Sequence, residues 1–362
     1  MACIYADNAA TTRLSDTAFD AMKPFMLAEY GNASTLYKLG RSAHKAVENA
    51  RGVFAKGINA YPAEIYFTSG GTESDNWAIK GTAHRLAESG KKHIVTDNIE
   101  HHAVLHSAKA LEREGFEVTY VSADNNGLVR AEDVAAAIRP DTAMVSVMFA
   151  NNELGTIQPV AEIGSICRSA GVLFHCDAVQ AAGILPIDVK QMNIDLLSIS
   201  AHKFHGPKGV GVMYARRGCV PETYIDGGEQ ERGHRAGTEN VAGIVGAAAA
   251  FAEAISERNE KADRLCAMRD EIQSGLMKIP GSQVNGVTAP RLPGTLNMSF
   301  DGIDGQSLIF ELDLKGLAAS SGSACASGSV DPSHVLLALG LPYKLAHGSL
   351  RLSLGRYNTP DE

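Results

Sequence analysis

A lysine at the end of an apolar stretch is the first feature that could do chemistry. Residues 194–210 read Ile-Asp-Leu-Leu-Ser-Ile-Ser-Ala-His-Lys-Phe-His-Gly-Pro-Lys-Gly-Val, so the apolar run ends in Ser200, His202 and Lys203 before a Gly-Pro turn. This pattern predicts a buried strand that delivers its last side chains to the edge of a sheet. Burial lowers the pKa of an amine and makes it nucleophilic. A lone lysine in this position more often extends into solvent, but the residues described next favour a Schiff-base lysine.

Three polar residues follow three other predicted strands. His101 follows residues 93–96, Asn152 follows residues 143–149, and Asp177 follows residues 172–175. Since the carboxyl ends of parallel strands meet at one edge of a sheet, where ligands bind in open α/β folds, these side chains should lie side by side. Taken singly, Asp177 could be a helix N-cap and His101 a structural histidine.

A glycine turn supplies an anion site. Gly70-Gly71-Thr72-Glu73-Ser74 lies between a predicted strand and a predicted helix, where backbone N–H groups and the Thr72 hydroxyl can hold a phosphate. The turn matches neither the dinucleotide fingerprint nor the P-loop, and alone it could simply connect a strand to a helix. Together with Lys203 and Asp177, however, it forms the set that pyridoxal phosphate (PLP) requires: an amine, an acid for the pyridinium nitrogen and a phosphate anchor.

The elements that position these residues alternate along the chain. Strands are predicted at residues 65–68, 93–96, 117–121, 143–149 and 172–175, with helices between them at 74–88, 103–114, 131–138 and 161–169. This alternation predicts an α/β fold with a mostly parallel central sheet. Residues 196–200 and 210–214 are expected to form a hairpin-like pair at one edge of that sheet.

A second, smaller α+β domain is expected after the sheet. One long helix over residues 240–278 should lead into it, and strands are predicted at 294–300, 318–320 and 349–354 with a helix at 305–314. We predict a large PLP-binding domain over residues 13–256, and a small domain of residues 1–12 and 257–362 that carries a loop containing Cys325.

Composition excludes several classes of function. Lys plus Arg number 33 and Asp plus Glu 41, a net charge of −8, which argues against nucleic-acid binding. No stretch is long and apolar enough for a membrane span, and no secretion signal is evident. The six cysteines form no C-x-x-C pair, so we expect no metal site and free thiols in a cytoplasmic protein.

Motifs along the whole chain carry a resemblance. The chain resembles the cysteine desulfurases of the NifS/IscS family, which implies a PLP-dependent transferase of fold type I. The matching segments are Tyr5-Ala-Asp-Asn-Ala-Ala-Thr-Thr12, Phe67-Thr-Ser-Gly-Gly-Thr-Glu-Ser-Asp-Asn76, Ala150-Asn-Asn-Glu-Leu-Gly155, Asp177-Ala-Val-Gln180, Ser200-Ala-His-Lys203, Arg232-Gly-His-Arg-Ala-Gly-Thr-Glu-Asn240 and Ser320-Ser-Gly-Ser-Ala-Cys-Ala326.

The resemblance implies a role for each matching position in cofactor binding. It implies that Lys203 binds PLP covalently, that Asp177 pairs with the pyridinium nitrogen and that His101 stacks on the ring and moves protons. The other implied contacts are Gln180 to the phenolic oxygen, Asn152 beside it, and Gly71, Thr72, Ser200 and His202 at the phosphate. Thr238 would reach the phosphate of a neighbouring subunit, which implies a homodimer with shared sites.

The resemblance also implies the substrate and the reaction. Arg351, assisted by Asn32 and Asn152, would bind the carboxylate of L-cysteine; without the resemblance, a strand arginine is more often part of a surface ion pair. The Cys325 thiol would then take the substrate sulfur as a persulfide, releasing L-alanine and passing the sulfur to an acceptor or an iron–sulfur scaffold protein. Cys325 could contact an iron–sulfur cluster in that transfer.

Two other functions remain open. A selenocysteine lyase would turn over without Cys325, and a non-catalytic sulfur-delivery scaffold would hold no PLP. Two positions depart from the family pattern: Ala33 replaces a proline, and Tyr37 stands where relatives have a histidine, so we assign Tyr37 no proton-relay role.

Overall fold

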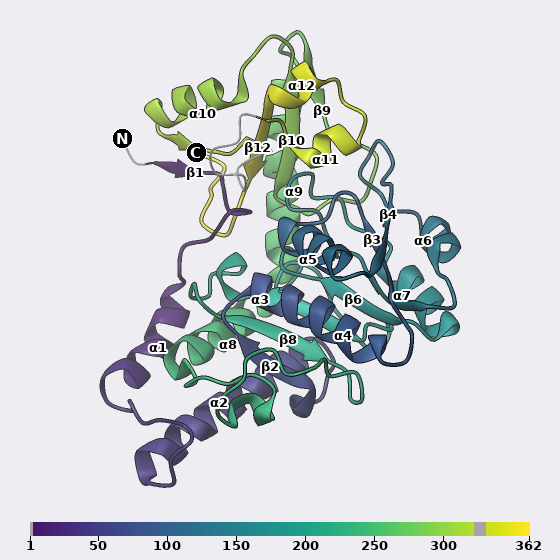
Figure 1. Ribbon diagram of the computed structural model, residues 1–362. Helices are drawn as coiled ribbons and strands as arrows, with labels where there is room; N and C mark the ends of the chain where they lie inside the picture. Colours follow the sequence, from purple (N-terminus) through teal and green to yellow (C-terminus); the bar gives the residue numbers. More distant parts are fainter. Residues whose placement is uncertain (1–2, 322–330) are drawn as a thin grey trace.

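A seven-stranded sheet forms the centre of the larger part of the molecule in the computed structural model, which describes residues 3–321 and 331–362 (Figure 1). The strand order is β2-β8-β7-β6-β5-β3-β4, and only β8 runs antiparallel to its neighbours. The strands are β2 (Ile65–Thr68), β3 (His93–Asp97), β4 (Glu117–Val121), β5 (Thr142–Ser146), β6 (Leu173–Asp177), β7 (Leu196–Ser200) and β8 (Gly211–Ala215).

The expected mostly parallel α/β sheet is therefore confirmed. β7 and β8 do pair antiparallel, but the prediction that this pair lies at an edge is wrong. β2 pairs with the far side of β8 and forms the edge itself. All four residues of β2 are buried. β2 is the first strand of this sheet along the chain, and its position is set by long-range pairing with β8, which the local sequence does not reveal.

Helices cover both faces of this sheet. Among the helices on one face, α4, α5 and the π-helical stretch after α3 contribute side chains to one buried apolar cluster, and the helices on the opposite face contribute to another. The first group is α3 (Gly71–Asn76), α4 (Thr82–Ala87) and α5 (His102–Arg113), and the second is α1 (Asp16–Leu27), α2 (Lys38–Gly57), α6 (Ala131–Ala137), α7 (Val160–Ala170) and α8 (Val241–Ser256). A π-helical stretch, Trp77–Gly81, joins α3 to α4, so the helical run begins at Gly71, earlier than predicted.

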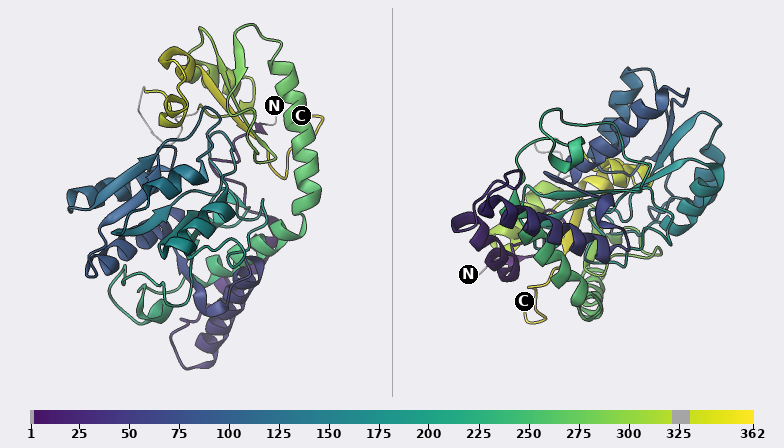
Figure 2. Two further views of the ribbon diagram at one scale, coloured as in Figure 1. Left: turned by 90° about the vertical axis from the view of Figure 1, so that its right-hand side faces the viewer. Right: turned by 90° about the horizontal axis from the view of Figure 1, so that it is seen from below.

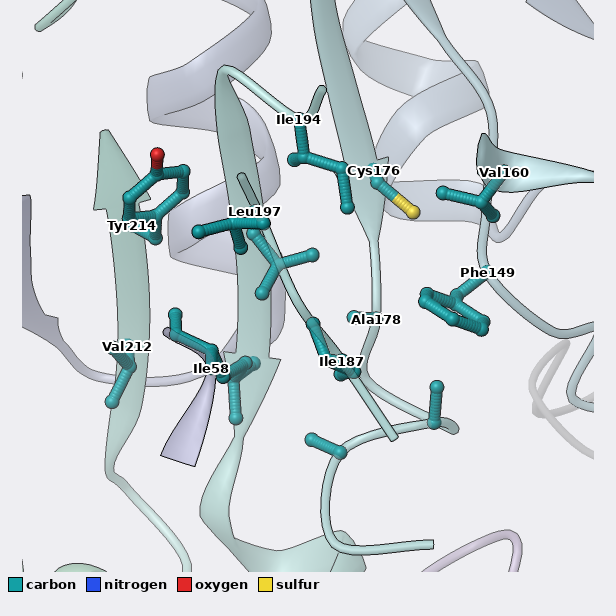
Figure 3. Close-up of a cluster of buried hydrophobic side chains, with 14 of the residues drawn as sticks. Ile58, Phe149, Val160, Cys176, Ala178, Ile187, Ile194, Leu197, Val212 and Tyr214 are labelled. Atoms are coloured by element: carbon teal, nitrogen blue, oxygen red, sulfur yellow. The ribbon is translucent and has the colours of Figure 1, made fainter. Parts of the chain in front are cut away.

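Strand alternation along β6 separates the core from the site. Phe174 and Cys176 belong to the larger apolar cluster, where Figure 3 shows Cys176 near Leu197 and Ile194. Because successive side chains of a strand point to opposite faces, His175 and Asp177 face the other side. Packing of Cys176 into the core thus orients Asp177.

A smaller sheet forms a second core. It contains β9 (Ser282–Val284), β10 (Thr295–Phe300) and β12 (Ser349–Ser353), all antiparallel, and its apolar residues include Met298 and Leu350. Beside it, β1 (Ile4–Tyr5) pairs parallel with β11 (Leu317–Ala318). The remaining helices are α9 (Arg258–Leu276), α10 (Gly305–Leu314), α11 (His334–Ala338) and α12 (Tyr343–His347).

The single long helix predicted over residues 240–278 is wrong. The chain forms α8 and α9, separated at Glu257, whose φ and ψ are −99° and 0°. The apolar α8 packs against α1 and α2, whereas α9 packs on β10. In Figure 2, α9 runs along one side of the molecule from the large sheet to the small one. The two packing partners require different axes, although the sequence is helix-forming throughout.

None of the helices within the described ranges has both the length and the apolar character needed to cross a membrane.

Candidate active site

The order of the parallel strands reverses between β3 and β5. After β3 the chain continues outward to β4, and after β5 it continues in the other direction to β6. Connections that leave in opposite directions open a crevice at the carboxyl ends of the strands, and ligands bind there in open α/β sheets. His101 follows β3, Asn152 follows β5 and Asp177 ends β6, so the expectation that these three adjoin is met.

A cavity of about 210 Å³ lies at this position. Most of the residues predicted for the site line it together. They are Gly71, Thr72, His101, Asn152, Asp177, Gln180, Ser200, His202, Lys203 and Arg351.

Two predicted site residues in the described part of the chain do not line this cavity, and a third cannot be placed. Asn32 is exposed, and its side-chain oxygen accepts a hydrogen bond from Ser34 N at 2.9 Å. Thr238 lies near the surface groove that Glu239 and Ala33 help to line. Cys325 lies outside the described residues.

Lys203 reaches the cavity from the short 3-10 turn after β7. Its Nζ donates hydrogen bonds to the carbonyl oxygens of Ala9 and, at 2.8 Å, Ala10. The same segment binds two more site residues, since Gln180 Nε2 donates to Ala9 O at 3.0 Å and His202 Nδ1 lies 3.1 Å from Thr11 Oγ1. Sequence reasoning identified this segment only as a motif of the family and missed its role in the site, because backbone carbonyls leave no signal in the sequence.

The His101 ring is held neutral in this site. Its Nδ1 accepts a hydrogen bond from Ala103 N at 3.1 Å and so caps α5, which leaves the ring proton on Nε2. Burial, reinforced by the positive charge of Lys203, lowers the pKa of His101 from 6.5 to about 4. A neutral ring can lie flat on an aromatic ligand and can still exchange a proton at Nε2.

We expect a nuclear magnetic resonance titration of the PLP-free protein to give the His101 ring a pKa of about 4, well below the ordinary 6.5. Because both burial and Lys203 disfavour the imidazolium, replacing Lys203 by Met should raise this pKa without restoring the ordinary value. A His101 pKa at or above 6.5 in the unmodified chain would contradict the buried, cation-facing position described here.

Asp177 and Asp75 place two carboxyl groups in the cavity wall. Asp177 is 6% exposed, and one of its oxygens accepts from Val179 N at 2.8 Å. Burial raises the pKa of Asp177 to about 6, although that N–H and Lys203 oppose the rise. The pKa of Asp75 is raised by burial and by the charge of Asp177. Two adjacent buried acids create a site for one cationic ring nitrogen, which would hold Asp177 ionised. Sequence reasoning missed Asp75, which lies inside a helix and away from the strand ends.

Another part of the cavity wall can accept a phosphate. Gly71 begins the helical run, and a Cβ at this position would lie 2.5 Å from Val179 Cγ2, so only glycine fits. Its backbone therefore approaches the cavity closely, beside Thr72 and Ser200. Glu73 fixes the turn: it accepts from Ser69 N at 2.8 Å and pairs with Arg235 at 2.8 Å.

Comparisons with known proteins agree with this geometry. The family model described as aminotransferase class-V matches residues 4–362. Cysteine desulfurase IscS of Methanosarcina thermophila is 51% identical over 359 residues, covering 99% of this chain and 89% of the relative. Its counterpart of the same name from Dictyoglomus turgidum (strain DSM 6724 / Z-1310) is 48% identical over 360 residues, covering 99% and 91%.

Solved structures resemble this protein over nearly the whole chain. A protein titled NifS-like protein superposes with a TM-score of 0.93 at 41% identity, covering 99% of this chain and 95% of that one. A structure titled SspA in complex with cysteine superposes with a TM-score of 0.86 at 35% identity, covering 98% and 100%.

The fold and the cavity define a PLP-dependent transferase, because the amine, the acid and the phosphate turn that PLP requires all line one crevice at the strand ends. The chain belongs to the class-V aminotransferase family and, within it, to the cysteine desulfurases of the NifS/IscS type. The family is PLP-dependent, so the resemblance, the fold class and the cofactor expected from the sequence are confirmed.

Proposed function

We propose that this chain removes sulfur from L-cysteine, releases L-alanine and holds the sulfur on Cys325 for transfer to an acceptor. The observation that carries the proposal is the single cavity whose walls include the Lys203 amine, the Asp177 carboxyl and the Arg351 guanidinium. These groups suit an α-amino acid bound to PLP: an amine that exchanges with its amino group, an acid for the ring nitrogen and a cation for its carboxylate.

PLP would be held at both ends of the cavity. Asp177 would bind the ring nitrogen, His101 would stack on the ring, and the phosphate would sit at Gly71 and Thr72 with Ser200 and His202. Gln180 and Asn152 would lie beside the phenolic oxygen. When bound, PLP supplies an electron sink for the bond changes at the α- and β-carbons of the substrate.

Three residues of the chain then act on the substrate. Arg351 binds its carboxylate, and the side chain of Asn152 lies beside it. The Lys203 amine would take the proton from the α-carbon. His101 carries its exchangeable proton on Nε2 and is neutral at pH 7, so it can move a proton without adding charge to the ring.

Cys325 is the proposed nucleophile. Its thiolate attacks the substrate sulfur, an S–S bond forms as the C–S bond breaks, and the carbon takes a proton, which gives alanine and a persulfide. Ser320, near the start of the segment that carries Cys325, exchanges backbone hydrogen bonds of 3.2 and 2.6 Å with Arg351. The described chain on the N-terminal side of this segment is therefore held against the residue proposed to bind the substrate carboxylate.

The far end of the same segment is attached to the site as well. The Ser333 hydroxyl donates to the buried Glu153 carboxyl, next to Asn152, and also caps α11. Burial raises the pKa of Glu153 to about 7, while Ser333 and the nearby charge of Arg351 oppose the rise. The contacts of Ser320 with Arg351 and of Ser333 with Glu153 therefore support the proposal that Cys325 attacks a substrate bound at Arg351.

We also infer a homodimer with shared sites. Asn32 and Thr238, which do not reach the cavity of their own chain, adjoin one surface groove that Ala33 and Glu239 help to line. Leu36, which also lines this groove, is 88% exposed, and Tyr30, two residues before Asn32 in the chain, is 71% exposed. A second copy packed on this surface would cover them and would receive Thr238 at its phosphate.

Residues 13–256 and residues 1–12 with 257–362 are proposed as the two domains. The break at Glu257 and the separate apolar core around β10 and β12 support this division. Ala9 and Arg351, from the smaller domain, line the cavity with residues of the larger one, so the site would lie between the two. The acceptor is proposed to be a sulfur-carrier or iron–sulfur scaffold protein.

A single-turnover experiment tests the function. The PLP-loaded protein is mixed with one equivalent of L-cysteine without reductant, and alanine and protein mass are measured. We expect one alanine and a mass gain of one sulfur atom, located by peptide mapping on Cys325. Alanine with elemental sulfur in solution and no sulfur bound to Cys325 would favour the lyase reaction instead. Absence of bound PLP and of alanine would favour the non-catalytic scaffold.

A further inference from the structure

Arg351 is a buried cation, and some of its N–H donors already bind other groups of the protein. It is 1% exposed on β12. Its Nη2 donates to Asp7 Oδ1 at 2.7 Å and its Nη1 donates to the carbonyl oxygen of Asn152 at 3.0 Å. Arg351 Nε is buried and has no hydrogen-bond partner among the described residues. A guanidinium has five N–H donors, so donors remain for a ligand in the cavity that Arg351 lines.

Asp7 is held in register with Arg351 by the backbone. Ser353 N donates to Ala6 O at 2.7 Å, and Asn8 N donates to Ser353 O at 3.1 Å, so the peptide groups on both sides of Asp7 bind the same residue of β12. Residues 351 and 353 lie on one face of that strand. The Asp7 side chain therefore meets Arg351 on a fixed backbone rather than at the end of a mobile loop.

Asp7 is also the carboxylate that balances this buried charge. It makes the one ion pair that Arg351 has within residues 3–321 and 331–362. The other carboxyl nearby, that of Glu153, bonds Ser333 instead. Two contacts on different Nη atoms fix the plane of a guanidinium, and a fixed plane is what bidentate recognition of a carboxylate needs.

We propose that Asp7 is a positioning residue for the substrate: it orients the Arg351 guanidinium so that the remaining donors receive the carboxylate of the amino acid. This inference rests on the proposed function, in which Arg351 binds that carboxylate. Two residues further on, Ala9 O accepts hydrogen bonds from Lys203 and Gln180. One short segment thus places the cation for the substrate carboxylate and the amine that acts at the neighbouring carbon.

The test compares Asp7→Ala with Asp7→Asn in the PLP-loaded protein. Asp7→Ala should raise KM for L-cysteine about 10- to 100-fold, as expected for a misplaced binding group, with little change in kcat. Asp7→Asn keeps an oxygen for Nη2 and should keep KM near the unmodified value. Removing one partner of a buried ion pair can also destabilise a fold. The Asp7→Asn variant and a comparison of L-cysteine with cysteamine distinguish that effect from a loss of positioning.

Inhibition by cysteamine, which is L-cysteine without its carboxylate, separates positioning from general damage. Its inhibition constant should be the same in both Asp7 variants as in the unmodified protein, as should PLP affinity. Asp16→Ala, which removes an aspartate from an exposed pair with Arg13, is the matched control. If Asp7→Ala weakens cysteamine and L-cysteine equally, or leaves KM unchanged, the inference is wrong.

Arg351→Ala distinguishes failure of this inference from failure of the function. If Arg351→Ala raises KM and Asp7→Ala does not, only the role of Asp7 is refuted. If Arg351→Ala leaves KM unchanged, the carboxylate site is misassigned and the inference falls with it.

Discussion

Replacing Cys325 by Ala should lower the rate of alanine release from L-cysteine by more than about 100-fold, as is typical when a catalytic nucleophile is removed. Without the thiolate, the substrate sulfur has no acceptor for its bond, so the C–S bond of a bound substrate persists. Alanine release is measured with excess reductant present, so that removal of sulfur from the enzyme does not limit the rate. Binding of PLP should not change.

The other cysteines make the comparison sharp. Burial raises the pKa of Cys167 to about 12 and raises that of Cys176 well above its usual range, so neither supplies a thiolate near neutral pH. Cys3 is exposed and does not line the cavity, so Cys3→Ala is the matched control. Equal alanine release by Cys325→Ala and Cys3→Ala would refute the persulfide mechanism and leave the lyase reaction.

The sheet could be predicted because each strand carries its own signal. Short apolar runs alternate with helical segments, and this pattern fixes the class of fold without any long-range information. What it could not fix is the neighbour of each strand. The edge position of β2 depends on pairing between Phe67 and Val212, which lie far apart in the chain. The bend at Glu257 likewise arises from what α8 and α9 pack against, and both segments favour a helix.

Most of the cavity could be predicted for a related reason. The carboxyl ends of adjacent parallel strands meet, so His101, Asn152 and Asp177 could be placed together from strand order alone, and the family resemblance added Gln180 and Arg351. The contribution of Asp7 could not be predicted in this way, because it depends on the contact with Arg351, which lies far away in the sequence. The roles of the Ala9 and Ala10 carbonyl oxygens could not be predicted either, since every residue has a carbonyl and only the fold determines which ones face an amine.

Replacing Lys203 by Ala should reduce alanine formation by about 1000-fold or more, the upper part of the range for a general base. The variant loses the amine that binds PLP covalently and the base that takes the α-proton, and no other lysine lines the cavity within the described residues. It should also lose PLP on dialysis after borohydride reduction, whereas the unmodified protein retains it. Lys208→Ala, at an exposed position in the following turn, is the matched control.

The loss of Lys203 should also be visible in the groups around it. Its positive charge lowers the pKa of both Asp177 and His101, so without it both values should rise, and Asp177 becomes a weaker partner for a cationic ring nitrogen. PLP should therefore bind less tightly as well as non-covalently. A Lys203→Ala variant that kept a tenth of the activity would show that another group removes the α-proton. A variant that lost activity but kept full PLP affinity would show that Lys203 acts as a base. It would also show that the charge of Lys203 has no effect on the binding of PLP by Asp177.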